Sequence, residues 1–573
     1  MRCSGNFDPR GDTKNKPTMR AVSLTAGLLA RLQRSRRGDL AFADPAEARA
    51  WIESLPQGQP ADVNRALVTA IDAFVAASID ASTQLDVLEV LRPLVHVVQA
   101  DLARRYRGSP APLRREQVDV VEDILGLWKC LAGAYLHCAL GGANRIRPRG
   151  PDKRQATALQ RSLDTTARLI AEHYYAYRLP PGSVYESLND MYRLGERLDL
   201  LRVPVTDPFQ KRRDTRCRDA WTRALLLDGC LPREHHHREL GIIYRLLEQW
   251  ATRVRVVAPT HPGPESIPPL YIDLSSACGL RPQAGTGEGV RALDVSALAS
   301  ELRQLLALVR QGAEVPGVVL GTDMSRREFE TLLLSLYRQW CEGGIRRMNE
   351  RQPSEAMAHV SAGLLAAHFY LGRKPFEQPF GPGTLPARGT QSKGAHSMER
   401  IRVATDYLQA NGIRAEQWRI RDESVSGLGM TRPHQEAGEP WINLGLLISV
   451  RPRGLNTTLV GTIRWMQEDE HKDLQLGIRL VPGIPVAIAA RMADAVEFEP
   501  AILMLPLPAA NAPSSLLVMP GRLSPRMVIE IYREGIDRIE ITALLESGGE
   551  FERFAFMPAG SVYDPGEEFE PST

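Results

Sequence analysis

The strongest constraint on the fold is a change in hydrophobic periodicity partway along the 573 residues. From about 45 to 255, apolar side chains recur at helical spacing, as in the stripe of Leu67, Ile71, Phe74 and Val75. After Gly344, short segments such as "QWRIRDES" and "LQLGIRLV" read instead as strands of a small antiparallel barrel. We therefore expect an α+β multidomain chain: an α-helical N-terminal region, a small antiparallel β-barrel and a further C-terminal β module.

Composition suggests where this chain divides. The predicted parts are a disordered polar tail over 1–40, an α-helical domain over 41–255, a Pro/Gly-rich linker with one short strand over 256–295, a helical connector over 296–344, a β-barrel over 345–490 and a β module over 491–573. The barrel should contain an insertion at about 372–415, because 374–396 are rich in Pro, Gly, Ser and Gln. Within the connector, Ser325 and Glu328 have the spacing of a helix capping box.

The totals exclude several classes of partner. A formal net charge of +3 is close to neutral for this length, so no nucleic acid is expected. We see no apolar run of about 18 residues and expect no membrane span. The seven cysteines are scattered without a C-x-x-C pair, which favours a reduced, cytoplasmic protein. Only eight of the 71 basic residues are lysine, and arginine suits guanine and phosphate recognition better.

Two short motifs frame the start of the barrel segment. Asp422, Ser424 and Gly427 form D-x-S-x-x-G, and Arg347 and Arg351 form R-x-x-x-R further upstream. In this order, with a series of strands after the second motif, the segment resembles the PilZ family of bacterial cyclic di-GMP-binding barrels. The resemblance covers about 345–490. It implies a PilZ-like barrel that binds cyclic di-GMP through these five residues.

The residue types suit that ligand. Arginine can meet a phosphate or the O6 and N7 atoms of guanine as a fork, and it can stack on a purine. The Asp422 carboxylate can accept from guanine N–H groups, the Ser424 hydroxyl can serve base or phosphate, and Gly427 permits a close backbone approach. Additional candidates are the nearby arginines Arg346, Arg400, Arg402 and Arg421. The alternative is a degenerate barrel in which Asp422 and Ser424 only close a turn.

The remaining motifs indicate no catalytic centre. The histidines of "REHHHREL" (233–240) point in different directions on a helix, so we expect a solvated helix start and no metal. We expect a receptor or effector, not an enzyme, with no cofactor besides the ligand, whose helical region contacts a protein partner. Gly343 and Gly344 would act as a hinge between the 325–342 helix and the arginine motif. The alternative function is a protein-interaction scaffold that binds no nucleotide.

Overall fold

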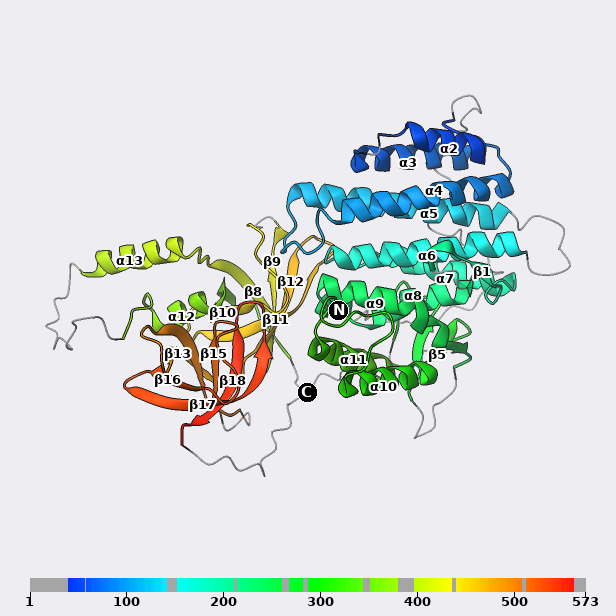
Figure 1. Cartoon of the computed structure of the whole chain (residues 1–573). Coiled ribbons are helices and arrows are strands. Elements are labelled where there is room, and N and C mark those ends of the chain that lie inside the picture. The colour runs from blue at the N-terminus through cyan, green and yellow to red at the C-terminus, as the bar shows by residue number, and fades with distance from the viewer. Residues whose placement is uncertain are drawn as a thin grey trace, which may run out of the picture.

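A stack of helices lies beside two β-barrels (Figure 1). The computed structural model describes residues 40–56, 58–141, 152–210, 214–259, 267–281, 287–343, 351–379, 396–434, 439–507 and 512–560. Nearly all of the predicted N-terminal tail, together with Arg346, Arg347 and most of the 374–396 segment, lies outside these ranges. The α+β architecture with a helical N-terminal region is confirmed.

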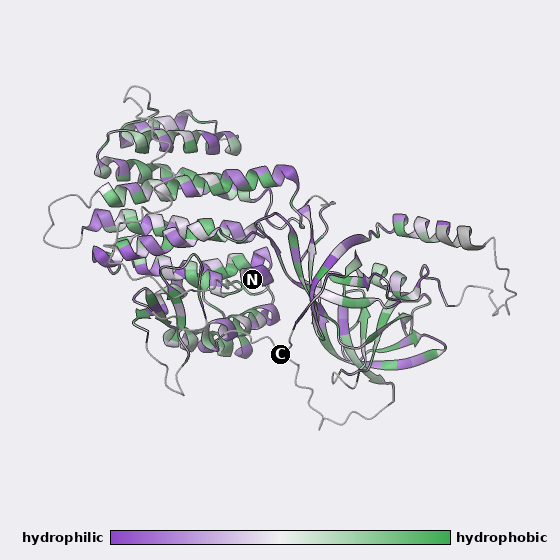
Figure 2. Ribbon diagram, turned by 180° about the vertical axis from the view of Figure 1, so that it is seen from behind, coloured by the Kyte–Doolittle hydropathy of each residue, from purple (hydrophilic) through white to green (hydrophobic). Residues whose placement is uncertain are grey.

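The helical region follows the predicted periodicity. Its helices are α2 (Pro45–Ser54), α3 (Pro60–Ala76), α4 (Ala81–Ala103), α5 (Arg115–Gly141), α6 (Lys153–Tyr175), α7 (Gly182–Arg197), α8 (Cys217–Gly229), α9 (His237–Trp250), α10 (Ser296–Gln311) and α11 (Arg326–Cys341), with the 3₁₀ turns η3 (Pro208–Gln210), η4 (Pro232–Glu234) and η5 (Ala251–Arg253) and a small β1 (Val205–Thr206)–β2 (Asp214–Thr215) ladder. One hydrophobic core joins the helices, and apolar stripes run along them in Figure 2. The Ser325–Glu328 capping box of α11 is confirmed.

Buried charges cross this helical core. The two terminal guanidinium nitrogens of Arg92 donate to Asp207 at 3.0 and 2.8 Å, and Arg161 donates to the same carboxylate at 3.3 Å. All three side chains are almost fully buried. Among the described residues, α5 is the helix that could span a membrane by length and composition, and 72% of its most apolar stretch is buried inside the molecule.

The segment 256–295, predicted as a linker with one short strand, contains more regular structure than expected. Strands β3 (Arg255–Val257), β4 (Leu270–Asp273) and β5 (Val290–Asp294) form an antiparallel sheet in the order β3-β5-β4. Alternating apolar residues give this sheet an inner face, and Ile272 and Leu293 pack into the helical core. The segment is therefore partly an extension of the helical region. The division of the whole chain into domains stays a prediction.

The first barrel consists of the strands β7 (Met357–Ala362), β8 (Glu416–Ser424), β9 (Gly427–Arg432), β10 (Leu447–Pro452), β11 (Leu459–Glu468) and β12 (Leu474–Leu480), with the short β6 (Gln352–Pro353) added alongside β8. Because β8 pairs with both β7 and β9, these six antiparallel strands close on themselves. Inward-facing side chains such as Trp418, Ile420 and Met430 fill the interior.

The connection from β7 to β8 contains two helices, α12 (Leu364–Gly372) and α13 (His396–Ala410). The apolar run 356–371 is thus a strand followed by a helix, divided at Gly363, whose φ of +88° few other residues adopt. Helix α12 packs between the barrels through Leu364 and Ala367. Helix α13 extends away on the side opposite the helical region (Figure 1).

The second barrel is also closed and antiparallel, in the order β13-β14-β15-β18-β17-β16. Its strands are β13 (Ile484–Met492), β14 (Glu499–Leu505), β15 (Ser515–Val518), β16 (Val528–Tyr532), β17 (Ile536–Ser547) and β18 (Glu552–Pro558). It begins at β13, slightly before the predicted boundary of 490, because the turn at Pro482-Gly483 separates β12 from β13.

Candidate functional site

Arg351 of the first predicted motif meets Asp422 of the second on the first barrel. Strand β6 pairs with β8 so that Pro353 lies opposite Asp422 and Gln352 opposite Glu423, which carries Arg351 alongside the same stretch of β8. A guanidinium nitrogen of Arg351 donates to the Asp422 carboxylate. The predicted proximity of these two residues, 71 positions apart in the chain, is therefore confirmed as geometry.

A β-bulge explains why Asp422 is on the outer face. The pairing of β8 with β9 shifts between Ile420, which faces the core, and Asp422, so that Arg421 is an extra residue on β8. Asp422 then lies opposite Gly429, and a Cβ added there would lie 2.6 Å from a carboxylate oxygen. The carboxylate thus occupies the space that the missing side chain of Gly429 leaves.

Two arginines hold this carboxylate ionised. Arg421 Nε donates to Asp422 Oδ2 at 3.0 Å while Arg351 bonds to Oδ1. Partial burial alone would raise the pKa of Asp422, but the hydrogen bonds and charges of Arg351 and Arg421 outweigh it, so the pKa lies below its ordinary value of 3.8. Asp422 is therefore an anion at neutral pH between two guanidinium groups.

Ser424 and Gly427 have local roles in the β8–β9 hairpin. The Ser424 hydroxyl donates to the Gly427 carbonyl at 3.2 Å and closes the turn. A Cβ at Gly427 would lie 2.5 Å from the Ile478 carbonyl on the neighbouring strand, so only glycine fits there without a shift. The turn-closing alternative thus describes Ser424 in this structure, whereas Asp422 bonds to arginines.

The outer face continues from Asp422 across three neighbouring strands. Gly429 of β9 lies opposite Gly477 of β12, and Gly477 lies opposite Trp465 of β11. The Trp465 indole covers Gly477, with Nε1 1.8 Å from where a Cβ would be. An anionic group and a large aromatic ring therefore flank a pair of glycines on this face.

A chain of polar side chains leads from the site to the helical region. Arg421 donates to the Gln475 amide oxygen at 3.1 Å, and Gln467 donates to the same oxygen at 3.1 Å. Arg233 of η4 reaches the Gln467 amide oxygen at 3.3 Å. The Arg233 guanidinium also lies 4.8 Å from the centre of the Trp465 ring.

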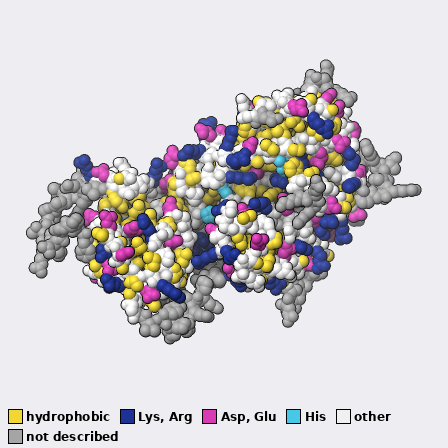
Figure 3. Space-filling model, in the orientation of Figure 1, with side chains coloured by type: hydrophobic (Ala, Val, Ile, Leu, Met, Phe, Trp, Pro, Cys, Tyr) yellow, Lys and Arg dark blue, Asp and Glu magenta, His cyan; other side chains and the backbone are white. Residues whose placement is uncertain are grey.

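Backbone contacts fix the seam that this chain crosses. Ala111, between α4 and α5, exchanges backbone hydrogen bonds with Ile442 at 2.8 and 3.0 Å, and Glu468 N donates to the Tyr177 carbonyl at 2.6 Å. Arg178 also pairs with Glu468 at 3.4 Å. Figure 3 shows basic side chains, with histidines beside them, gathered along the seam. The helical region is therefore attached directly to the first barrel, through Ile442 and through Glu468 of β11.

The other predicted arginines lie in three different parts of the chain. Arg346 and Arg347 lie outside the described residues. Arg400 and Arg402 belong to α13, where Arg402 is exposed and lies 3.9 Å from Asp406 of its own helix. Arg421, by contrast, contacts the site directly.

Sequence reasoning missed Gly429, Gln475, Trp465 and Arg233. Gly429 continues the alternation of the motif, and Gln475 is the polar residue between the core-facing Leu474 and Leu476. These two had a detectable signal. The contribution of Arg233 depends on how the two regions dock, which no local pattern shows.

The histidine run, His235 to His237, lies at the start of α9. Within the described ranges, no group of three or more His, Cys, Asp or Glu side chains is placed to hold an ion. The solvated helix start is wrong for His235, which is buried: its ring nitrogens lie 3.0 Å from the Cys230 carbonyl and 3.3 Å from the Glu239 carboxylate.

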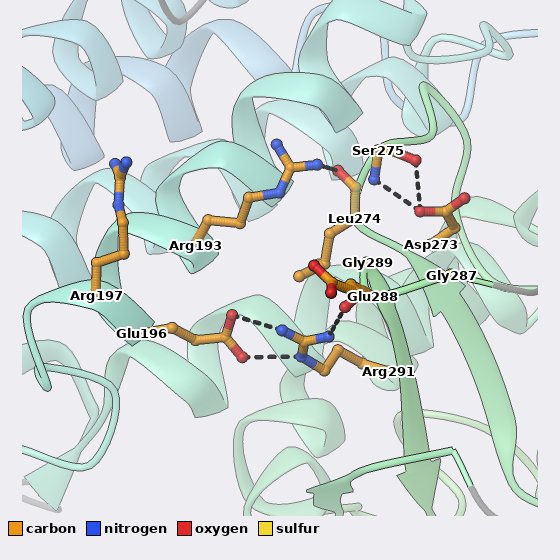
Figure 4. Close-up of a pocket in the computed structure, with 10 residues that line it drawn as sticks. All are labelled: Arg193, Glu196, Arg197, Asp273, Leu274, Ser275, Gly287, Glu288, Gly289 and Arg291. Atoms are coloured by element: carbon orange, nitrogen blue, oxygen red, sulfur yellow. Dashed lines mark hydrogen bonds and ion pairs between the residues drawn. The ribbon is translucent and has the colours of Figure 1, made fainter. Parts of the chain in front are cut away.

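A cavity of about 540 Å³ opens between α7 and the β4–β5 sheet (Figure 4). Two of its three arginines already have acidic partners: Arg291 forms a fork with Glu196 at 2.9 and 3.0 Å, and Arg193 bonds to Asp190 at 2.8 Å. Asp273 and Glu288 add further negative charge to the lining. This balanced charge gives the cavity no preference for an anion.

The fold and the site together define a class of protein: a helical region docked on a closed barrel with an arginine–aspartate pair on its face, followed by a second barrel. Comparisons with known proteins add a particular likeness. Residues 46–261 match the family "Cyclic-di-GMP receptor FimW, N-terminal domain", and residues 486–559 match the "FimW C-terminal beta-barrel domain". The chain is 20% identical over 589 aligned positions to the cyclic-di-GMP receptor FimW of Pseudomonas aeruginosa, covering 92% of this chain and 93% of that protein.

The comparisons indicate a less specific class of protein than the predicted PilZ family. They match the chain to the domains of a cyclic-di-GMP receptor and do not specify PilZ. The first barrel, which carries the motif, lies between the two matched segments. Its assignment as PilZ-like therefore stays a proposal.

Proposed function

We propose that this chain is a cyclic di-GMP receptor, and that the ligand binds on the outer face of the first, PilZ-like barrel. The observation that carries the proposal is the meeting of Arg351 with Asp422 on that face. Support comes from the likeness to FimW along 92% of the chain. The chemistry needed is binding rather than catalysis, and no cofactor enters it.

Each group at the site has a counterpart on the ligand. The Asp422 carboxylate now accepts hydrogen bonds from the N–H groups of Arg351 and Arg421. In the complex it would accept them from the N1 and N2 hydrogens of a guanine instead. The Arg351 guanidinium, released from Asp422, can bind a phosphate as a fork. Arg347, four residues before Arg351, would add a second guanidinium. Ser424 and Gly427 would shape the rim.

Ligand binding would reach the helical region through the polar chain. A guanine that hydrogen-bonds to Asp422 would weaken the bond from Arg421 to that carboxylate. Because Arg421 also bonds to Gln475, the hydrogen bonds of Gln475 and Gln467 would then change. The last member, Arg233, belongs to the helical region. We infer that this shift alters a surface of the helical region that contacts a protein partner. By linkage, a partner that prefers the bound form also tightens ligand binding.

The location of the protein is part of the proposal. Within the described ranges, the cysteines Cys130, Cys138, Cys217, Cys230, Cys278 and Cys341 are all free. This agrees with a reduced, cytoplasmic environment.

Titration calorimetry of the full chain with cyclic di-GMP tests the site. We expect binding by the wild type and a loss of at least about tenfold in Asp422→Ala. Absence of binding by the folded wild type would replace the receptor with a scaffold whose barrel is degenerate. Hydrogen exchange tests whether the polar chain transmits binding to the helical region: with ligand, protection should change at η4 and α9 as well as near Asp422. A change confined to the barrel would refute transmission through the polar chain but not the proposed binding site.

A further inference from the structure

A second cavity on the first barrel has a different character. It has a volume of about 490 Å³ and lies between the end of α12 and the β10–β11 hairpin. Its lining is His359, Phe369, Tyr370, Arg373, Arg451, Pro452, Arg453, Gly454, Leu455 and Asn456. None of the described motif residues, Arg351, Asp422, Ser424 and Gly427, lines it.

This cavity is separate from the candidate site. His359 of β7 lies opposite both Gln417 of β8 and Arg451 of β10. Gln417 and Asp422 are five positions apart on β8, which corresponds to roughly 15 Å along the strand. The cavity is also displaced towards β10, on the far side of β7 from the Arg351–Asp422 pair. One small ligand cannot occupy both.

Among the described residues, the lining is cationic and has no carboxylate. Arg373 is held in place by the Asn456 backbone and side-chain oxygens, at 3.1 and 3.3 Å. Arg451 and Arg453 are exposed, and none of the described residues that line the cavity offers them a carboxylate. Arg373, Arg451 and Arg453 thus line one cavity whose described wall carries no acidic side chain. This differs from the cavity of Figure 4, where Glu196 neutralises Arg291.

Rings and apolar surface complete the lining. The Arg451 guanidinium lies 5.9 Å from the centre of the Tyr370 ring. Phe369 is anchored by stacking on Tyr407 of α13, with ring centres 5.8 Å apart and planes at 17°. Leu455 is 60% exposed beside them. A flat apolar group can therefore rest here while an attached anion meets the arginines.

We propose that this cavity binds a nucleotide phosphate. Guanidinium groups bind phosphate as forks and stack on or pair with a purine, and the half-buried Tyr370 ring adds a surface for stacking. The volume lies within the range of about 300–1,000 Å³ that small ligands occupy. The ligand is either a mononucleotide or a second cyclic dinucleotide, since both carry a phosphate ester and a purine. The proposal does not depend on ligand binding at Asp422.

Equilibrium binding of GMP to the full chain tests this cavity, with Arg451→Ala and Arg453→Ala as the variants. We expect GMP to bind the wild type and each variant to bind it at least about tenfold more weakly. Arg533→Ala is the matched control, because Arg533 is an exposed hairpin arginine of the second barrel, and it should bind as the wild type does.

Cyclic di-GMP titrated into Asp422→Ala distinguishes the two sources. Binding that survives Asp422→Ala and disappears on adding Arg451→Ala assigns the cavity to the cyclic dinucleotide. Binding of GMP alone assigns it to a mononucleotide. If neither nucleotide binds, or if both Arg451→Ala and Arg453→Ala bind like the wild type, the proposal is wrong, whatever happens at Asp422.

Discussion

Replacing Gly429 with alanine should damage ligand binding without removing any ligand-binding side chain. The added Cβ would lie 2.6 and 2.7 Å from the two Asp422 oxygens, whereas ordinary contact begins at 3.4 Å. The carboxylate must therefore move away by about 0.8 Å. Such a shift takes the 3.0 Å bond from Arg421 beyond hydrogen-bond range. We expect a loss of about 1–2 kcal/mol in binding free energy, or about 5- to 30-fold in the affinity for cyclic di-GMP.

The same change should leave the fold nearly as stable as before. Glycine within a strand costs about 0.5–1 kcal/mol relative to alanine, which offsets much of the weakened ion pair at this partly exposed position. Calorimetry with cyclic di-GMP and urea unfolding measure the two effects. Gly126→Ala is the control, because a Cβ there has nothing within 4 Å. A folded Gly429→Ala protein with wild-type affinity would refute the placement of the ligand against Asp422.

Other variants probe the hairpin, the charge and the helical core. Ser424→Ala loses one neutral hydrogen bond to the Gly427 carbonyl, worth about 1 kcal/mol, so its affinity in calorimetry should fall by no more than about fivefold. Because the folded-state pKa of Asp422 is depressed, its stabilising contribution is complete above 3.8 and is lost as the pH falls through the lowered pKa. The difference in unfolding free energy between wild type and Asp422→Asn should thus be constant from about pH 8 to 5 and shrink below pH 3.8; a change centred near pH 6 would contradict this. Asp207→Asn removes the hydrogen-bonded counterion of the buried Arg92 guanidinium and leaves it only the Asp164 carboxylate, 3.9 Å away. We expect the protein to be destabilised by about 3–5 kcal/mol in urea unfolding, and a change below about 1 kcal/mol would be inconsistent with the burial.

Periodicity and motif order predicted the parts of the fold that depend on local patterning. The helical stripe through Leu67 and Ile71 is buried in the helical core as expected, and the order of the two motifs predicted that Arg351 lies beside Asp422. Neither required knowledge of tertiary packing. Binding at these residues stays a prediction.

What the sequence did not predict depends on strand parity and docking. The bulge at Arg421 turns Asp422 to the outer face, and a strict two-residue alternation cannot reveal it. The contact between Arg233 and Trp465 exists only because the helical region docks on the barrel. The 256–295 segment looked like a linker because its strands are short and separated by Pro and Gly, although their apolar faces are buried.

The most direct test of the receptor proposal is the affinity of the full chain for cyclic di-GMP in wild type, Arg351→Ala and Arg419→Ala. Arg419 is the control: it is an exposed arginine on β8 whose nearest acidic partner, Glu355, is 3.6 Å away. The proposed site predicts that Arg351→Ala binds at least about tenfold more weakly than wild type, since a charge-assisted contact contributes about 1.5–3 kcal/mol. Arg419→Ala should bind within about twofold of wild type, because exposed ion pairs contribute little. Equal affinity of Arg351→Ala and wild type would contradict the site.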